Sequence, residues 1–139
     1  SPPIPTWRPS SKGFSNTSGP IVVKGKVIQG LQGCDRYREE RCFISAYDAG
    51  SGKLAWKFHT VAHKGEPGGD TWNDLPDMMR QGGETWIAGT YDPDLNTTYW
   101  GTAQAKPWTR ATRGSGSGAT LYANATLALT SRQGSSARP

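Results

Sequence analysis

The chain has 139 residues, a formal net charge of +5 and a hydrophobic content of 34%. Its basic residues form no dense run and no nucleic-acid-binding motif is visible, which excludes specific nucleic-acid binding from our prediction. No apolar run approaches the length of about 18 residues that a membrane-spanning helix needs. The 18 glycines and 10 prolines argue against long helices.

The first half of the chain predicts two β-hairpins. Residues 1–12 are rich in proline and serine and are expected to form an extended lead-in. Apolar and polar residues then alternate over residues 20–29, with Lys24-Gly25 at the turn, and again over 42–61, with a turn at 49–52. This period indicates strands with one buried face, so both stretches are predicted to form antiparallel sheet.

A third hairpin is predicted near the middle of the chain. Strands are expected over residues 84–92 and 96–103. Pro93 presets φ for the turn between them, and Asn96 tolerates its left-handed exit. Four glycines in or beside these strands are expected to let backbone or a flat ligand come close: Gly82, Gly83, Gly89 and Gly101.

Longer connections separate these elements. Residues 62–83 are expected to form a long insertion, in which 75–81 make one helical turn. Residues 109–119 are expected to be a flexible loop, and 122–130 hold the last strand. Most of the six tryptophans are expected to lie in the core, because aromatic side chains dominate core energetics.

The two cysteines, Cys34 and Cys42, flank a polar stretch of seven residues. This separation permits a disulfide that closes the loop, and a pair of free buried thiols is the alternative. Two cysteines are too few ligands for a zinc site, and His59 and His63 lie on a strand-like stretch that does not suit a metal.

Four motifs occur in a fixed order from residue 82 onward: Gly82-Gly83-Glu84-Thr85-Trp86, Tyr91-Asp92-Pro93-Asp94-Leu95-Asn96, Tyr99-Trp100-Gly101-Thr102 and Pro107-Trp108. An earlier stretch carries Ala46, Asp48, Gly52 and Trp56 at the spacing of a propeller-blade element. Together these motifs resemble the quinoprotein alcohol dehydrogenases. The resemblance covers residues 13–129 and implies an all-β fold, a partial β-propeller with about three blades' worth of antiparallel sheet and long loops.

The resemblance also implies cofactors and a setting. Enzymes of that family oxidise alcohols or sugars with pyrroloquinoline quinone (PQQ) and Ca²⁺ in the periplasm. We therefore expect PQQ, Ca²⁺, a small alcohol or sugar substrate, and a periplasmic or secreted location, and we do not expect residues 1–10 to act as a signal peptide. An oxidising compartment favours the disulfide between Cys34 and Cys42.

Carried over position by position, the resemblance assigns site residues. The metal ligands fall on Asp35 and Gln104, whose oxygens suit a hard cation, and Trp86 falls on the tryptophan that stacks under PQQ. The remaining cofactor-binding positions are Glu84, Thr85, Gly33 and Cys34. Three of these positions also have a purely structural interpretation: Asp35 as an ion-paired loop residue, Gln104 as a surface amide and Trp86 as part of the core.

The family's catalytic aspartate has no counterpart, because its segment would begin after residue 130. Residues 130–139 depart from the family pattern and are expected to be a disordered or frame-shifted tail after the quinoprotein-like part at 13–129. We therefore assign no catalytic residue and expect the chain to lack full dehydrogenase activity. Exposed sheet edges predict self-association.

Two functions of other classes stay open. The chain could be a small tryptophan-rich binding module for carbohydrate or another planar ligand. It could also be a remnant with a recruited, unrelated enzymatic activity, for which Asp35, His59 and His63 are the first residues to examine. Fold resemblance alone does not decide between them.

Overall fold

The computed structural model describes residues 13–35 and 40–132, and these residues form an all-β structure with short helices. The strands are β1 (Ile21–Val23), β2 (Lys26–Gln29), β3 (Phe43–Asp48), β4 (Leu54–His59), β5 (Gln81–Gly82), β6 (Thr90–Asp92), β7 (Thr97–Gly101), β8 (Ala105–Lys106) and β9 (Thr126–Thr130). The helices are the 3₁₀ turns η2 (Gly69–Trp72) and η3 (Asp77–Met79) and the α-helix α1 (Arg110–Arg113). In these two ranges no helix has the length and apolar character needed to cross a membrane.

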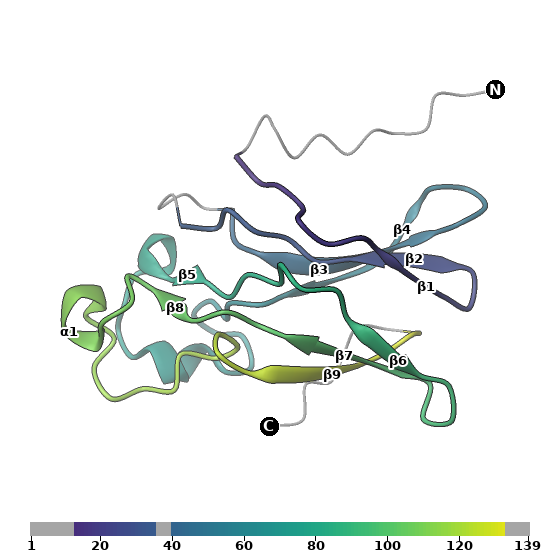
Figure 1. The fold of residues 1–139 in the computed structure, drawn as a ribbon. Coiled ribbons are helices and arrows are strands. Elements are labelled where there is room, and N and C mark those ends of the chain that lie inside the picture. Colours follow the sequence, from purple (N-terminus) through teal and green to yellow (C-terminus); the bar gives the residue numbers. More distant parts are fainter. Residues whose placement is uncertain (1–12, 36–39, 133–139) are drawn as a thin grey trace.

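The first four strands form an antiparallel sheet in the order β1-β2-β3-β4 (Figure 1). Lys24 and Gly25 make the turn between β1 and β2 with φ values of 46° and 73°. Positive φ at both central residues is the geometry of the tight turns that join twisted strands. Both predicted hairpins in the first half of the chain are confirmed.

A second sheet has the order β6-β7-β9, and β5 pairs with β8 in a two-stranded ribbon. The predicted strand at 84–92 is wrong over its first part, because β6 begins only at Thr90. The backbone at Glu84 and Thr85 is bound elsewhere: Thr85 N–H donates to Leu31 O (2.8 Å), and Glu84 O accepts from Ala103 N–H (2.7 Å). The left-handed conformation expected at Asn96 is confirmed by its φ of 51°.

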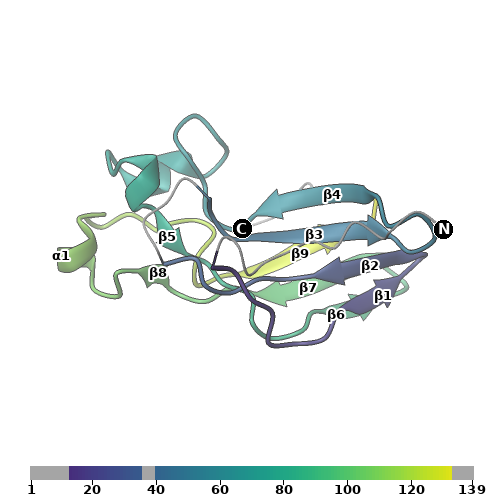
Figure 2. The same ribbon diagram turned by 90° about the horizontal axis from the view of Figure 1, so that it is seen from above.

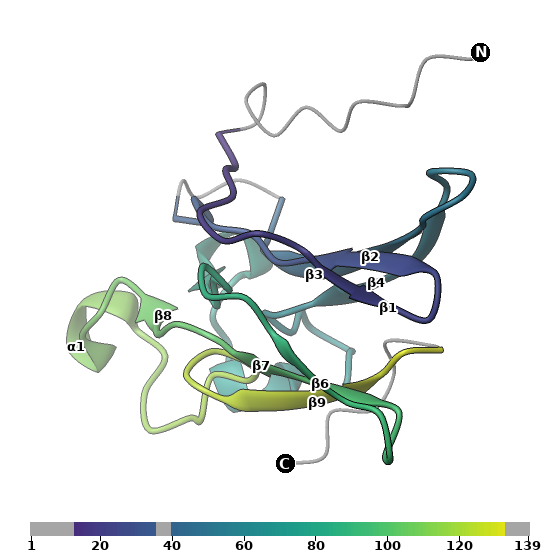
Figure 3. The same cartoon turned by 45° about the vertical axis from the view of Figure 1, so that its right-hand side comes forward.

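The two larger sheets face each other and share one hydrophobic core (Figures 2 and 3). Its buried residues come from β1–β4 and from β7 and β9: Val23, Ile28, Ile44, Ala46, Trp56, Trp100, Leu127 and Leu129. The indole N–H of Trp56 crosses to the other layer and donates to Ser131 O (3.2 Å). Each sheet therefore covers one face of the other.

The short elements gather at one end of the molecule, where β5, β8 and α1 lie (Figure 1). Residues 62–83, predicted to be a long insertion, contain η2 and η3 and end in β5, and η3 supplies the expected helical turn. The predicted flexible loop at 109–119 is wrong over its first residues, which form α1. Thr109 caps this helix by accepting from Thr112 N–H (3.1 Å), and Gly114 ends it with a φ of 78°.

Cys34 and Cys42 form a disulfide, as predicted. The bridge joins the segment after β2 to the start of β3. It belongs to a small buried cluster with Phe14, Leu31 and Phe43. The disulfide therefore anchors the backbone of Cys34, the residue directly before Asp35.

Candidate functional site

The candidate site is built on a segment, residues 82–85, that is hydrogen-bonded to loops on both sides. On one side, Gly82 N–H donates to Cys34 O (2.9 Å), and on the other, Gly83 N–H donates to Gln104 O (3.4 Å). Gly82 has a φ of 98°, and a Cβ there would lie 2.3 Å from Gln104 O. Only glycine allows this conformation and this close contact, so the motif Gly82-Gly83 brings the three segments together.

A pocket of about 400 Å³ opens where these segments meet, within the usual size range of small-ligand sites. Its lining residues are Gln32, Gly33, Asp35, Glu84, Trp86, Ala103, Gln104, Lys106 and Trp108. Five of the seven residues that the sequence assigned to the site are among them. The other two are buried behind the wall: Cys34 lies in the disulfide, and Thr85 Oγ1 accepts from Leu31 N–H (3.0 Å).

Lys106, which no sequence motif assigned to the site, is the charged centre of this pocket. Its Nζ lies 2.8 Å from Glu84 Oε1 and 3.4 Å from Asp35 Oδ2. Burial opposes the ammonium charge, but the hydrogen bonds and charges of Glu84 and Asp35 outweigh it and raise the pKa of Lys106 above its ordinary value. The Glu84 side chain is only 6% exposed, so this ion pair is largely shielded from water.

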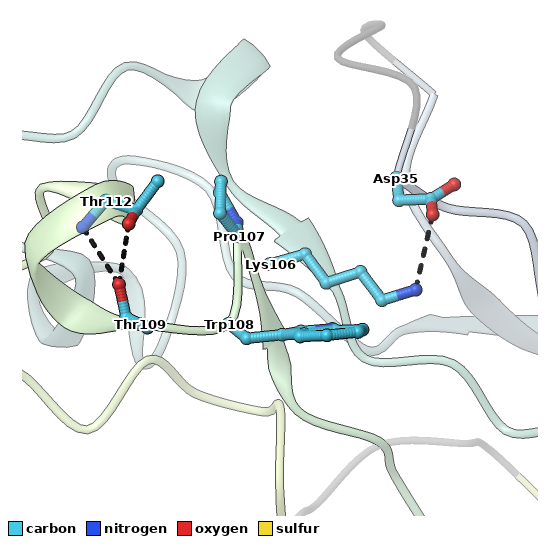
Figure 4. Close-up of a pocket in the computed structure, with 6 residues that line it drawn as sticks. All are labelled: Asp35, Lys106, Pro107, Trp108, Thr109 and Thr112. Carbon is cyan, nitrogen blue, oxygen red and sulfur yellow. Dashed lines mark hydrogen bonds and ion pairs between the residues drawn. The ribbon is translucent and has the colours of Figure 1, made fainter.

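Trp108 continues the pocket into a neighbouring hollow of about 380 Å³, lined by Asp35, Lys106, Pro107, Trp108, Thr109 and Thr112. Figure 4 shows the Lys106 side chain extended toward Asp35, with the Trp108 ring seen edge-on beside it. Trp108 is 73% exposed and Trp86 is 52% exposed. Both aromatic faces are therefore available to a ligand.

Arg113, from α1, holds the segment that carries Lys106 and Trp108. Its guanidinium donates to the carbonyl oxygens of Ala105 (3.3 Å), Pro107 (2.6 Å) and Trp108 (3.3 Å). A buried arginine that satisfies several carbonyls fixes a loop without regular strand pairing. The Pro107-Trp108 motif was the only sequence signal for this part of the site.

Of the residues named for a recruited activity, Asp35 does not share a pocket with the two histidines. His59 is at the end of β4, and His63 Nδ1 lies 3.8 Å from Asp77 Oδ2. Neither histidine lines the two pockets that contain Asp35. Across residues 13–35 and 40–132, no group of three or more His, Cys, Asp or Glu side chains is arranged to hold a metal ion.

The four glycines of the third hairpin differ in what surrounds them. A Cβ at Gly83 would lie 2.7 Å from Thr60 O, and one at Gly89 would lie 2.5 Å from the Trp100 ring. At Gly101 nothing lies within 4 Å of such an atom. The first two glycines, like Gly82, therefore serve internal packing.

Comparison with known proteins places the chain in a family. The family model described as "PQQ: Glucose/ethanol/alcohol dehydrogenase, beta-propeller domain" matches residues 5–137. The chain belongs to this family. The expected partial β-propeller is confirmed, with one four-stranded sheet, one three-stranded sheet and one two-stranded ribbon in the described part of the chain.

Individual relatives support the same family assignment. Quinohemoprotein alcohol dehydrogenase ADH IIB of Pseudomonas putida is 40% identical over 131 residues, which cover 86% of this chain and 18% of that protein. The structure of quinohemoprotein alcohol dehydrogenase ADHIIG from Pseudomonas putida HK5 matches with a TM-score of 0.75 and 31% identity, over 90% of this chain and 19% of that one. A europium-containing methanol dehydrogenase matches with a TM-score of 0.72 and 25% identity, over 88% of this chain and 24% of that one. The chain thus spans about a fifth of the length of such relatives.

The pocket fits the cofactor of this family better than it fits a divalent metal ion. PQQ is planar and carries carboxylates, and the pocket offers two exposed indole faces beside a lysine ammonium and the Gln32 and Gln104 amides. The two carboxylates of the pocket, in contrast, are both paired with Lys106. A divalent ion could reach them only by displacing that ammonium.

Proposed function

We propose that this chain forms part of the PQQ-binding wall of a quinoprotein alcohol dehydrogenase, with Trp86 as the stacking surface. One observation carries the proposal: Trp86, Trp108 and the Lys106 ammonium line a single pocket. Glu84, Gly33 and Gln104 complete the wall, and Thr85 and Cys34 support it from behind. When bound, PQQ supplies an ortho-quinone that accepts hydride from an alcohol or sugar.

In this proposal the chain's own residues bind and orient the cofactor. Stacking on Trp86 contributes about 0.5–1.5 kcal/mol beyond the burial of area, and Lys106 attracts a carboxylate of the ligand. The affinity for PQQ is then weak, on the order of high micromolar to millimolar, which corresponds to about 4–6 kcal/mol. Asp35 and Glu84, the carboxylates that line the pocket, are paired with Lys106 and are poorly placed to accept a substrate proton, so the 139 residues alone do not oxidise alcohols.

Equilibrium dialysis tests the proposal, with bound PQQ measured by its own absorbance. We expect Trp86→Ala to weaken binding at least about threefold, the effect of losing a stacked ring. Ile87→Ala is the matched control, because Ile87 is the next residue, is 62% exposed and lines neither pocket. Equal PQQ affinity in unaltered protein and Trp86→Ala would remove the basis of the proposal.

A carbohydrate-binding module is the second candidate, favoured by two exposed indoles beside the Gln32 and Gln104 amides. The same dialysis with neutral sugars distinguishes this module from the PQQ-binding wall. Binding of a sugar without binding of PQQ fits only the carbohydrate-binding module. Substrate turnover without PQQ would instead indicate a recruited activity.

The proposal includes a location and an assembly state. A disulfide is typical of an oxidising compartment, which supports a periplasmic or secreted location. Val22 on β1 and Leu54 on β4, the two edge strands of the first sheet, are 70% and 53% exposed, which supports self-association. Light scattering at micromolar concentration should give a dimer or a larger species, and a monomer would contradict this part.

A further inference from the structure

Lys106 lies where a cation would be expected, between the two carboxylates of the pocket. Its Nζ is 2.8 Å from Glu84 Oε1 and 3.4 Å from Asp35 Oδ2. The Lys106 side chain is 20% exposed and that of Glu84 is 6% exposed, whereas Asp35 is half exposed. The shorter pair is therefore the more protected of the two.

The backbone on both sides of this ion pair is fixed. Arg113 donates to the carbonyls of Ala105 and Pro107, the residues that flank Lys106. Glu84 is held through its own carbonyl, which accepts from Ala103 N–H. Since both partners belong to hydrogen-bonded segments, the ammonium and the carboxylate are placed together by the fold and not by two free side chains.

We propose that the Lys106 ammonium takes the place of a divalent metal ion in this pocket, so that an anionic quinone binds here without metal. Asp35, Glu84 and the Gln104 amide together offer the oxygen ligands that hard cations prefer. A divalent ion near them would meet the like charge of Lys106 and would have to displace this ammonium from both carboxylates. The statement about quinone rests on the proposed function, whereas the statement about cations does not.

The ammonium can serve both the protein and a ligand. It has three N–H donors, and the two carboxylates engage two of them. Among the described residues these two are its only acceptors, so the third N–H can serve an anionic group in the pocket. Charge-assisted hydrogen bonds of this kind are about twice as strong as neutral ones. A lysine in this position thus supplies the positive charge that a metal would otherwise contribute.

Removal of the ammonium should create a cation site, which terbium luminescence sensitised by Trp86 and Trp108 measures without any quinone. We expect Lys106→Met to bind Tb³⁺ at least about tenfold more tightly than the unaltered chain, with Ca²⁺ competing in the range of about 0.1–1 mM typical of weak calcium sites. The added substitution Glu84→Gln should abolish the gain. Lys53→Met, which removes an exposed lysine outside both pockets, is the matched control.

Two outcomes of this experiment overturn the inference. One is a saturable Tb³⁺ site in the unaltered chain that Asp35→Asn removes, and the other is Lys106→Met binding Tb³⁺ no more tightly than the unaltered chain. If Lys106→Met fails to fold, as judged by circular dichroism, Lys106→Gln replaces it, and the measurement on the unaltered chain still decides.

Equilibrium dialysis of the unaltered chain against PQQ, once with EDTA and once with Ca²⁺, tests whether the quinone binds without metal. We expect the two affinities to agree within about twofold, since the positive charge is built into the chain. Binding that requires Ca²⁺ overturns the inference. Absence of PQQ binding under both conditions overturns the proposed function and the claim that a quinone binds without metal. The claim that Lys106 excludes a divalent ion is then decided by the Tb³⁺ experiment alone.

Discussion

The sheet β1–β4 and the segment from residue 62 to residue 125 are stabilised by different interactions. The sheet buries Ile28, Ile44 and Trp56 on one face, and its strands pair with their sequence neighbours. In the later segment, β6 and β7 belong to the second sheet, but β5 pairs with β8 over only two residues and most of the remaining backbone lies in loops. This segment is organised around buried polar side chains, above all Arg80 and Arg113.

Arg80 illustrates the second kind of stabilisation. Its side chain is fully buried and donates to the carbonyl oxygens of Leu75, Ala62, Gly69 and Asn73 at 2.8–3.2 Å. These carbonyls lie outside the β-strands and have no strand partner, so one guanidinium satisfies all four of them. The region carrying the candidate site therefore depends on single polar residues, whereas the sheet spreads its stability over many apolar ones.

The largest expected effect follows from that dependence. Arg80→Met should lower the free energy of unfolding by about 3–5 kcal/mol, because the carbonyls lose a charged donor while staying buried. Arg110→Met, at an exposed arginine of α1, should stay within about 0.5 kcal/mol. Urea unfolding measures both, and similar losses for the two variants would contradict the proposed difference between the regions.

The disulfide should have the next largest effect. The double substitution Cys34→Ser and Cys42→Ser should cost about 2–3 kcal/mol, the chain-entropy value for so short a loop. The same urea experiment measures this loss. Intact mass with and without reductant should differ by about 2 Da, one hydrogen per thiol. Two thiols that alkylate freely in the unreduced folded protein would contradict the bridge.

Packing between the two regions can be tested at a glycine. A Cβ at Gly30 would lie 2.1 Å from Thr85 Oγ1 and 2.6 Å from Thr85 O, so Gly30→Ala should cost about 1–3 kcal/mol through overpacking. Gly101→Ala is the control, because nothing lies within 4 Å of its added atom. Thermal unfolding of the two variants should separate them clearly. Equal midpoints would mean that the junction at Thr85 is loose.

The smallest expected effect is a pH dependence of stability that comes from His59 at the end of β4. Burial, and next the charge of Arg41, hold the pKa of His59 at about 4, below its ordinary 6.5. Between these values the unfolded chain binds the proton more readily, so stability is full above about pH 6.5 and falls as pH drops toward 4. Because His59 is partly exposed, we expect a loss of only about 1 kcal/mol.

His59→Gln should flatten this part of the stability–pH curve, measured by urea unfolding between pH 4.5 and 6.5. His63, whose pKa is also lowered by burial, titrates in the same window and is tested in parallel by His63→Gln. The pKa of Glu66 is lowered to about 2, mainly by its hydrogen bond from Arg41, so protonation of Glu66 changes stability only below pH 4.5. If stability changes with pH equally steeply in both histidine variants and in the unaltered chain, the loss of stability does not come from these histidines.

Sequence patterns predicted the elements whose partners are close in the chain. The hairpins of β1–β2 and β3–β4 follow from alternation and from turn residues such as Lys24-Gly25, and β6–β7 from the turn before Asn96. The motifs also predicted five residues of the pocket. They did not predict that residues 84–89 leave the strand, because the partners of this segment, Leu31 and Ala103, lie in distant loops.

Periodicity and ordered motifs were sufficient to predict the all-β class and the resemblance to the quinoprotein family, and that resemblance favoured the disulfide over two free thiols. The full set of residues that make up the site became visible only in the folded chain. The fold brought Lys106 between Glu84 and Asp35, gave Arg80 and Arg113 their carbonyl partners, and left Trp86 and Trp108 exposed around one pocket. The physical reason is that charge pairing and loop hydrogen bonding depend on distances between segments far apart in the chain, which local patterns do not encode.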